Sequence, residues 1–180
     1  MKRLLIPLFS ILISLNSYGI ELDSLFGITL NGNAEKYISS NYINSNKQKN
    51  HETLDGFYNL DLTDKIKTKN PYFSIYSLTL DTNNNIHSIE GYEYYSDINR
   101  CLEFLETLSS SLESKYNFDF EYEETFYPNG VRYENLSRPS SSSIFVTQCN
   151  EEDKESHLMI IYLETEELAD ARTEFYESGL

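Results

Sequence analysis

Apolar and polar residues recur with a period of two in some stretches of the chain and of three to four in others, which predicts strands and helices. Residues 72–80 (YFSIYSLTL) and 86–95 (IHSIEGYEYY) are rich in aromatic and β-branched types, and the polar residues 81–85 (DTNNN) separate them. Two such runs around a short polar turn are typical of a β-hairpin. Gly91 lies within the second run, and we expect it to mark a β-bulge.

A helical period covers residues 97–116. Apolar side chains recur there at steps of three and four and therefore form one stripe: Ile98, Cys101, Leu105, Leu108, Leu112 and Tyr116. We expect Ser96 to be the N-cap of this helix, with Asp97 favourable to the helix dipole in the first turn. Cys101 is then expected to face the core near the start of the helix.

Alternation of apolar and polar residues returns at residues 118–127 (FDFEYEETFY). It predicts a strand with acidic residues on its wet side and three aromatic residues on its buried side, Phe118, Phe120 and Tyr122. The later predicted elements are a strand at 131–136, a serine-rich loop at 137–143, strands at 143–149 (SIFVTQC) and 157–163 (HLMIIYL), and a C-terminal helix capped by Thr165. The residues before 71 carry weaker signals: a short strand at 25–30, a short helix at 33–40, a loop at 44–52 and an edge strand at 56–62.

The predicted order over residues 71–180 is hairpin, helix, hairpin, hairpin, helix, and a less regular part at 20–70 precedes it. Sequential antiparallel strands with helices on one face form an α+β layer fold. We therefore expect a single domain, residues 20–180, built as an antiparallel sheet of hairpins with helices packed on one face. A chain of this length suffices for one hydrophobic core and is short for two.

Residues 1–19 have the three parts of a secretory signal peptide. Two basic residues open the chain, residues 4–15 are mostly apolar, and Ser17 and Gly19 are small residues at the −3 and −1 positions of a cleavage site. The apolar run is shorter than the roughly 20 residues of a membrane span. We expect the leader to be cleaved, the mature chain to have no membrane anchor, and the protein to be periplasmic or secreted.

The chain is strongly acidic, because 29 Asp and Glu stand against 14 Lys and Arg, for a formal net charge of −15 at pH 7. Removal of the leader takes away Lys2 and Arg3 and no acid, so the exported form carries −17. This excess argues against DNA, RNA and anionic lipid as partners, because they would be repelled. It favours a cationic partner, either a basic protein or a metal ion, or else it serves only to keep the protein soluble.

Cys101 and Cys149 are the two cysteines of the chain, and Cys149 ends the predicted strand at 143–149. Two thiols in an oxidising compartment most often form one disulfide. A helix-to-strand bridge would close a loop of about 50 residues and contribute on the order of 4 kcal/mol through chain entropy. The alternatives are two buried free thiols or a reactive nucleophile, although no histidine lies nearby in the sequence to stabilise a thiolate.

No pattern in the sequence points to catalysis, a metal or a cofactor. Asp81, Asn83 and Asn85 have the 1-3-5 spacing of an EF-hand loop. Ile86 and Tyr92, however, stand where that loop requires glycine and glutamate. The histidines lack a second ligand at metal-binding spacing: His51, His87 and His157. The serine-rich stretch has no G-x-S-x-G elbow, and we expect no enzymatic activity, no cofactor and no metal site.

Tyrosine is abundant, at 15 residues, and often neighbours an acid. Tyrosines offer rigid contact area, and flanking carboxylates select a basic partner. The leading hypothesis is a small exported acidic binding protein for a basic protein, such as an inhibitor or an immunity-type protein. Its candidate contact residues are Tyr92, Glu93, Tyr94, Glu121, Glu123 and Tyr133.

Two alternatives to a binding protein remain open at this point. One is a structural or accessory protein of the cell envelope without catalytic activity. The other is a hydrolase that uses two carboxylates, which requires a concave pocket holding one carboxyl of raised pKa. A pocket of that kind favours the hydrolase, and a flat sheet face argues against it.

Overall fold

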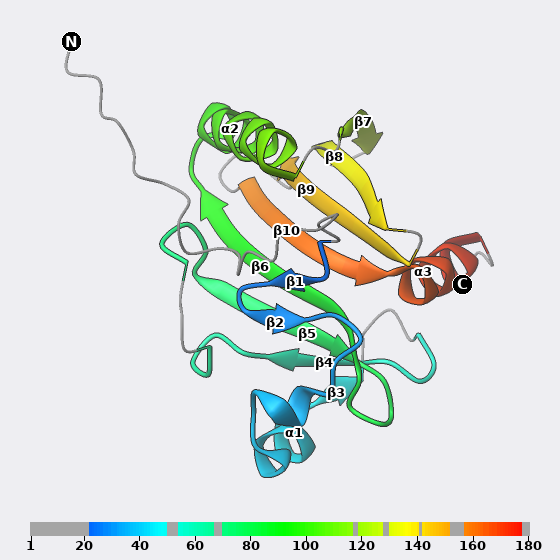
Figure 1. Cartoon of the computed structure of the whole chain (residues 1–180). Coiled ribbons are helices and arrows are strands. Elements are labelled where there is room, and N and C mark those ends of the chain that lie inside the picture. The colour runs from blue at the N-terminus through cyan, green and yellow to red at the C-terminus, as the bar shows by residue number, and fades with distance from the viewer. Residues whose placement is uncertain are drawn as a thin grey trace.

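The computed structural model describes residues 22–49, 54–66, 70–116, 119–127, 130–140, 142–151 and 157–177. Its centre is an eight-stranded antiparallel sheet in the order β3-β4-β5-β6-β10-β9-β8-β7 (Figure 1). The strands of this sheet are β3 (Gln48–Lys49), β4 (Tyr58–Asp61), β5 (Ile75–Leu80), β6 (Ile86–Tyr95), β7 (Glu121–Tyr127), β8 (Gly130–Ser140), β9 (Ser143–Glu151) and β10 (His157–Thr165). The other elements are a hairpin of β1 (Ser24–Leu25) and β2 (Ile28–Thr29), a 3-10 turn at Ala34–Lys36, and the helices α1 (Ser40–Asn46), α2 (Ile98–Tyr116) and α3 (Glu166–Glu177).

The α+β class is confirmed, and the chain order is hairpin, helix, hairpin, hairpin, helix from β5 onward. The hairpins are β5–β6, β7–β8 and β9–β10. In space, however, β10 lies beside β6, and β7 is an edge strand of the sheet. Helix α2 therefore connects β6 to the edge strand across the three strands between them (Figure 1).

The N-terminal part differs in detail from its weak sequence signals. The predicted strand at 25–30 is two strands of two residues, β1 and β2, joined by a turn at Phe26 and Gly27. Residues 44–52 were expected as a loop, but α1 and β3 occupy most of the described part of that stretch. The predicted leader at 1–19 lies outside the described residues. None of the described helices has the length and apolar character needed to cross a bilayer.

One face of the sheet packs against α2. The predicted stripe forms the inner side of this helix, and its buried members are Cys101, Leu105, Leu108, Leu112 and Tyr116. The strands below supply Phe145 from β9 and Met159 and Ile161 from β10, all of which belong to the same buried cluster. The helical period in the sequence therefore identified the inner side of α2 correctly.

The N-terminal hairpin covers the other half of this face (Figure 1). Phe26 lies in the turn of the hairpin in a left-handed conformation, with φ of 54°. Its ring contacts the rings of Tyr76 and Phe73 edge-on, at centroid distances of 4.9 and 5.6 Å. Edge-to-face aromatic pairs of this kind add to the apolar area that they bury.

The glycine in β6 has a different role from the expected one. Gly91 pairs in regular register with Tyr76 of β5 and Ile161 of β10, so no bulge forms there. The irregularity of this hairpin lies nearer its turn, where His87 is the extra residue between two paired positions. A Cβ added at Gly91 would lie 2.6 Å from Cζ of Phe26. Glycine at this position therefore allows the N-terminal hairpin to pack directly on the sheet.

The starts of α2 and α3 are capped by side chains. Asp97 caps α2, because its Oδ1 accepts a hydrogen bond of 2.9 Å from the backbone N–H of Asn99. The sequence prediction of Ser96 as N-cap is wrong by one residue. Thr165 caps α3 as predicted, since its Oγ1 accepts from the backbone N–H of Leu168 at 3.3 Å.

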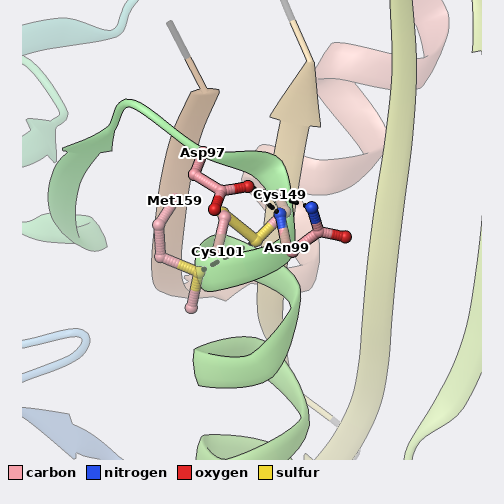
Figure 2. Close-up of a disulfide and its surroundings, with 5 residues drawn as sticks. All are labelled: Asp97, Asn99, Cys101, Cys149 and Met159. Atoms are coloured by element: carbon pink, nitrogen blue, oxygen red, sulfur yellow. Dashed lines mark hydrogen bonds between the residues drawn. A yellow bond between two sulfur atoms is a disulfide. The ribbon is translucent and has the colours of Figure 1, made fainter.

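The helix-to-strand disulfide is confirmed. Cys101 in the first turn of α2 is bonded to Cys149 of β9, with a Cα–Cα distance of 6.1 Å (Figure 2). Both residues are fully buried, and Sδ of Met159 lies 3.7 Å from Sγ of Cys149. The bridge fastens the start of α2, next to its Asp97 cap, onto the centre of the sheet. A free thiol and a nucleophilic cysteine are thereby both ruled out for these two residues.

Helix α3 and strand β7 differ from their predicted arrangement. Helix α2 packs on the expected face, but α3 turns back along the opposite face, where Arg172 reaches Glu90 and Glu164. Strand β7 begins at Glu121 and is exposed on both sides. Glu121 and Glu123 are exposed on one side, and Tyr122 on the other retains 61% of its accessible surface. Phe120 just before the strand is partly buried against Phe145, as the alternation predicted.

Candidate functional site

The face of the sheet opposite α2, here called the open face, carries a depression of about 530 Å³. Strands β6, β8, β9 and β10 form much of its lining, and α3 forms one wall. Charged residues and tyrosines dominate its polar lining, among them Glu90, Tyr92, Arg132, Tyr162, Glu164 and Arg172. Concave sites with a few convergent polar groups are where proteins usually bind ligands.

Two buried glutamates and one arginine form the centre of this depression. Arg172 Nη2 lies 3.4 Å from Oε1 of Glu90, and its Nη1 lies 3.1 Å from Oε2 of Glu164. The two carboxylate side chains keep only 10% and 5% of their surface. A guanidinium can pair with two carboxylates at once because its donors are fixed in a planar fork.

The sheet register brings the two glutamates together. Glu90 of β6 pairs with Tyr162 of β10, and Glu164 pairs with Ser88 of β6. The two carboxylates therefore stand two positions apart on adjacent strands and on the same face. Arg172 lies on α3, the helix that follows β10, and its guanidinium reaches both carboxylates.

Hydroxyl groups satisfy the Glu90 carboxylate. Ser77 and Ser88 donate to it at 2.8 Å each, and the hydroxyl of Tyr92 donates to Oε2 in a short hydrogen bond. With Arg172 these donors compensate for the burial of the charge. Burial and the nearby Glu90 carboxylate raise the pKa of Tyr92 far above its usual value, so this hydroxyl acts as a neutral donor.

Glu164 is less well compensated than Glu90. Burial raises the pKa of its carboxyl to about 7, and Arg172 opposes this shift while Glu90, Glu134 and Glu166 add to it. The carboxyl is thus half protonated near neutral pH. Arg172 also lies over the ring of Tyr162, with its Cζ 5.8 Å from the ring centroid, and this contact holds the guanidinium above the sheet.

The six contact residues that the sequence suggested are split between the two faces of the sheet. Tyr92, Tyr94, Glu121 and Glu123 belong to the open face by strand alternation, whereas Glu93 pairs with Met159 and Tyr133 pairs with Cys149 on the side of α2. Tyr133 packs against the core. The exposed members are Tyr94, Glu121 and Glu123, while Tyr92 is held by Glu90.

Sequence reasoning missed Glu90, Glu164 and Arg172. A signal for the two glutamates existed, because each is the one acid of its stretch, inside IHSIEGY or at the end of the mostly apolar HLMIIYLE. Buried acids are rare unless they are paired. The pairing itself was invisible, because it depends on β10 lying beside β6 and on α3 returning over the open face.

Charge is distributed unevenly along the chain. Residues 22–69 contain six lysines and six acidic residues, whereas residues 70–180 contain 22 acidic residues and six Lys and Arg. The second segment supplies strands β5 to β10. It therefore forms nearly all of the depression and most of the open face. The negative potential of the molecule is therefore concentrated on the half that carries the candidate site.

No metal centre is found in the part of the chain that the structure describes, where no three His, Cys, Asp or Glu side chains come together as ligands. The Asp81 carboxylate, which begins the EF-hand-like spacing, accepts hydrogen bonds from Asn83 and Asn85 within its own turn. Its pKa is lowered, because these bonds and the charge of His87 together outweigh burial, the largest single effect. This is a hairpin turn closed by an aspartate.

Comparison of the chain with protein-family models, with curated proteins and with solved structures finds no match.

Proposed function

We propose that this chain is a small exported acidic protein that binds a basic protein, in the manner of an inhibitor or an immunity-type protein. The observation that carries the proposal is the charge of the open face. Beside the paired Glu90 and Glu164 it presents further carboxylates at Glu121, Glu123 and Glu134. Such a surface repels anionic partners and attracts cationic ones.

The way in which the site holds its own Arg172 supports the proposal. Arg172 is held by two carboxylates and lies over the Tyr162 ring, which is how a partner's arginine or lysine would also be held on this surface. Glu134 extends the same chemistry toward the edge of the sheet, and burial and the nearby Glu123 raise the pKa of its carboxyl against the opposing charge of Arg132. A cation next to Glu123 and Glu134 would relieve that repulsion.

The test compares three forms of the tagged mature protein, residues 20–180, in low-salt capture from envelope extracts. The variants are E121K/E123K, which reverses charge on the open face, and the matched control E103K/E106K, which makes the same charge change on the exposed side of α2. We expect a basic protein to be captured by the wild type and the control, lost with E121K/E123K, and released when NaCl is raised from about 20 to about 300 mM. Equal capture by all three forms, or capture by none, contradicts the proposal.

Export is part of this proposal and has its own measurement. When the full chain is produced in a bacterium with its leader, we expect the mass of the product to match a chain that begins near Ile20. Recovery of the protein from the cytosol with Met1 still attached contradicts export.

A second candidate function is a hydrolase that uses two carboxylates. It is favoured by one observation, the concave site in which Glu164, with a pKa of about 7, stands near Glu90. One carboxyl would then donate a proton and the other would act as base or nucleophile, as in glycosidases. Arg172 covers both groups and restricts access to them, which is why binding is the better supported of the two.

The hydrolase is tested with the wild-type protein and the variants Glu164→Gln and Glu90→Gln on peptidoglycan, chitin oligosaccharides and 4-nitrophenyl glycosides. Turnover by the wild type that falls about a hundredfold or more in both variants supports it. Absence of turnover by the wild type on all of these substrates contradicts this candidate and leaves the binding proposal intact.

A further inference from the structure

Strand β7 leaves one long side of the sheet unpaired. It runs over seven residues, Glu121–Tyr127, and within the described residues its backbone pairs only with β8. Its outer N–H and C=O groups therefore have no strand partner among the described residues. The opposite edge of the sheet is different, because β3 has only two residues. A long unpaired edge is a template for another strand, which is why proteins usually shorten or cover such edges.

The side chains of β7 also make it unusual among the described strands. Tyr122 and Phe126 retain 61% and 74% of their accessible surface and point to the same side of the strand. The described residues include five exposed large hydrophobic residues in all, Ile75, Tyr94, Tyr122, Phe126 and Tyr176. Two of the five thus lie on one edge strand. Exposed aromatic residues at an edge supply contact area for a docked strand at low entropic cost.

We propose that β7 is a docking edge to which a basic protein adds one of its own strands, with basic residues on one side of that strand and apolar residues on the other. The inference rests on the proposed function, because it names the way in which the basic partner binds. Strand addition derives affinity from backbone hydrogen bonds and specificity from the alternating side chains.

The pattern of the added strand follows from the alternation of β7. Glu121 and Glu123 lie on the open face, with Glu134 of β8 directly behind Glu123 in the register. Basic side chains of the added strand on that face would lie opposite these carboxylates. On the other face, apolar side chains would pack beside Tyr122 and Phe126, which lie on either side of Glu124. Cross-strand pairs of opposite charge and pairs with aromatic residues both stabilise a sheet.

Charge selects a basic strand over a second copy of this chain. If two β7 strands paired with each other, the edge of each copy that carries Glu121, Glu123 and Glu124 would lie against the same acidic edge of the other. Like charges on directly paired strands are destabilising, and both molecules carry a large net negative charge. The acids on β7 thus prevent self-association through this edge and admit a cationic strand.

The test uses a fluorescein-labelled peptide of roughly eight residues that alternates lysine and valine, the pattern of a basic-and-apolar strand. The control peptide has the same composition but is ordered as two lysines followed by two valines, repeated. Each face of the extended control peptide therefore carries both lysine and valine. We expect saturable binding of the alternating peptide by fluorescence anisotropy, at least about tenfold tighter than that of the control peptide, with slower hydrogen exchange confined to the β7 amides. Equal affinity for the two peptides overturns strand addition.

Protein variants separate this inference from the function on which it rests. Y122S/F126S changes exposed side chains and is expected to weaken binding of the alternating peptide by about tenfold or more, as is E121K/E123K, while E103K/E106K binds as the wild type does. Thermal unfolding of each variant verifies that it is folded. If Y122S/F126S still captures a basic protein, and if the alternating peptide does not displace that protein, docking at β7 is overturned. The proposed function then still stands. Failure to capture any basic protein overturns the function itself, and dimerisation through β7 in sedimentation overturns the exclusion of a second copy.

Discussion

Gly91 shows how a single missing side chain supports the packing of the N-terminal hairpin. A Cβ at this position would lie 2.6 Å from Cζ and 2.9 Å from Cε2 of Phe26, and 3.2 Å from Cγ2 of Ile161. Because Phe26 is itself held by Tyr76, its ring has little room to move. We expect Gly91→Ala to lower the free energy of unfolding by about 1–3 kcal/mol, measured by urea denaturation.

A substitution of Phe26 tests whether its ring causes the loss of stability in Gly91→Ala. In a Phe26→Leu background the ring that meets the added Cβ is absent, and the cost of Gly91→Ala should shrink to well under half. An equal cost in both backgrounds would show that the strain at Gly91 arises elsewhere.

Glu164 gives the protein a pH dependence of definite sign. Its pKa is about 7 in the folded state, mainly through burial, against an ordinary value of 4.5. Between these two values the folded protein holds a proton that the unfolded chain has lost, so the free energy of unfolding falls as pH rises through this interval. The loss is on the order of 3 kcal/mol at most, since one pKa unit corresponds to about 1.4 kcal/mol.

The variant Glu164→Gln isolates this effect, because a glutamine neither titrates nor changes shape greatly. We expect the decline in unfolding free energy between about pH 5 and pH 8 to be markedly smaller in the variant than in the wild type, as measured by urea denaturation at several pH values. A decline of the same size in both proteins would assign it to other groups.

At the scale of elements, the disulfide joins α2 to β9. Cys101 and Cys149 are 48 positions apart in the sequence, and the corresponding loop gives a chain-entropy contribution of about 4 kcal/mol. We expect the double variant C101A/C149A to lose about 2–5 kcal/mol of unfolding free energy in guanidinium denaturation. Because the sulfurs are fully buried, alanine also leaves a small void that adds to the loss.

A second comparison separates the link from the packing of the sulfurs. The wild-type protein treated with a thiol reductant keeps both side chains but loses the bond, and it should show most of the loss seen in C101A/C149A. Unchanged stability after complete reduction, with two thiols found by mass spectrometry, would contradict a stabilising role for the bridge.

At the scale of the whole molecule, the uneven charge has a cost for stability. Residues 70–180 contain 22 acidic against six basic residues, and their mutual repulsion opposes the compact state. We expect the unfolding free energy to increase as NaCl is raised from about 10 to about 300 mM, because salt screens exposed charges. The measurement is urea denaturation at constant pH.

A matched variant tests whether repulsion causes this salt response. E103Q/E106Q/E174Q/E177Q removes four charges from exposed positions on α2 and α3. It should be more stable than the wild type at low salt and gain less from added salt. An equal gain in both proteins would point to a general effect of salt on hydration instead.

The features that the sequence predicted correctly are those that depend on near neighbours along the chain. Steps of three and four identified the inner side of α2 and placed Cys101 on it, and a hydroxyl at the right offset identified Thr165 as the cap of α3. The N-cap of α2 was misplaced by one residue because Ser96 and Asp97 are both good caps, and local pattern does not choose between them. Alternation also predicted a buried side for β7. Burial needs a partner layer, however, and the described part of the chain provides none over Tyr122 at the sheet edge.

The sequence by itself determined the α+β class, the order of hairpins and helices, and the pairing of the two cysteines, because hydrophobic period, turn residues and the number of cysteines are properties of the chain alone. Tertiary structure alone decided that β10 lies beside β6 and that α3 returns over the open face. Glu90, Glu164 and Arg172 meet only through these two arrangements. Strand order and register depend on which surfaces pack best over long sequence separations, and no local pattern carries that information.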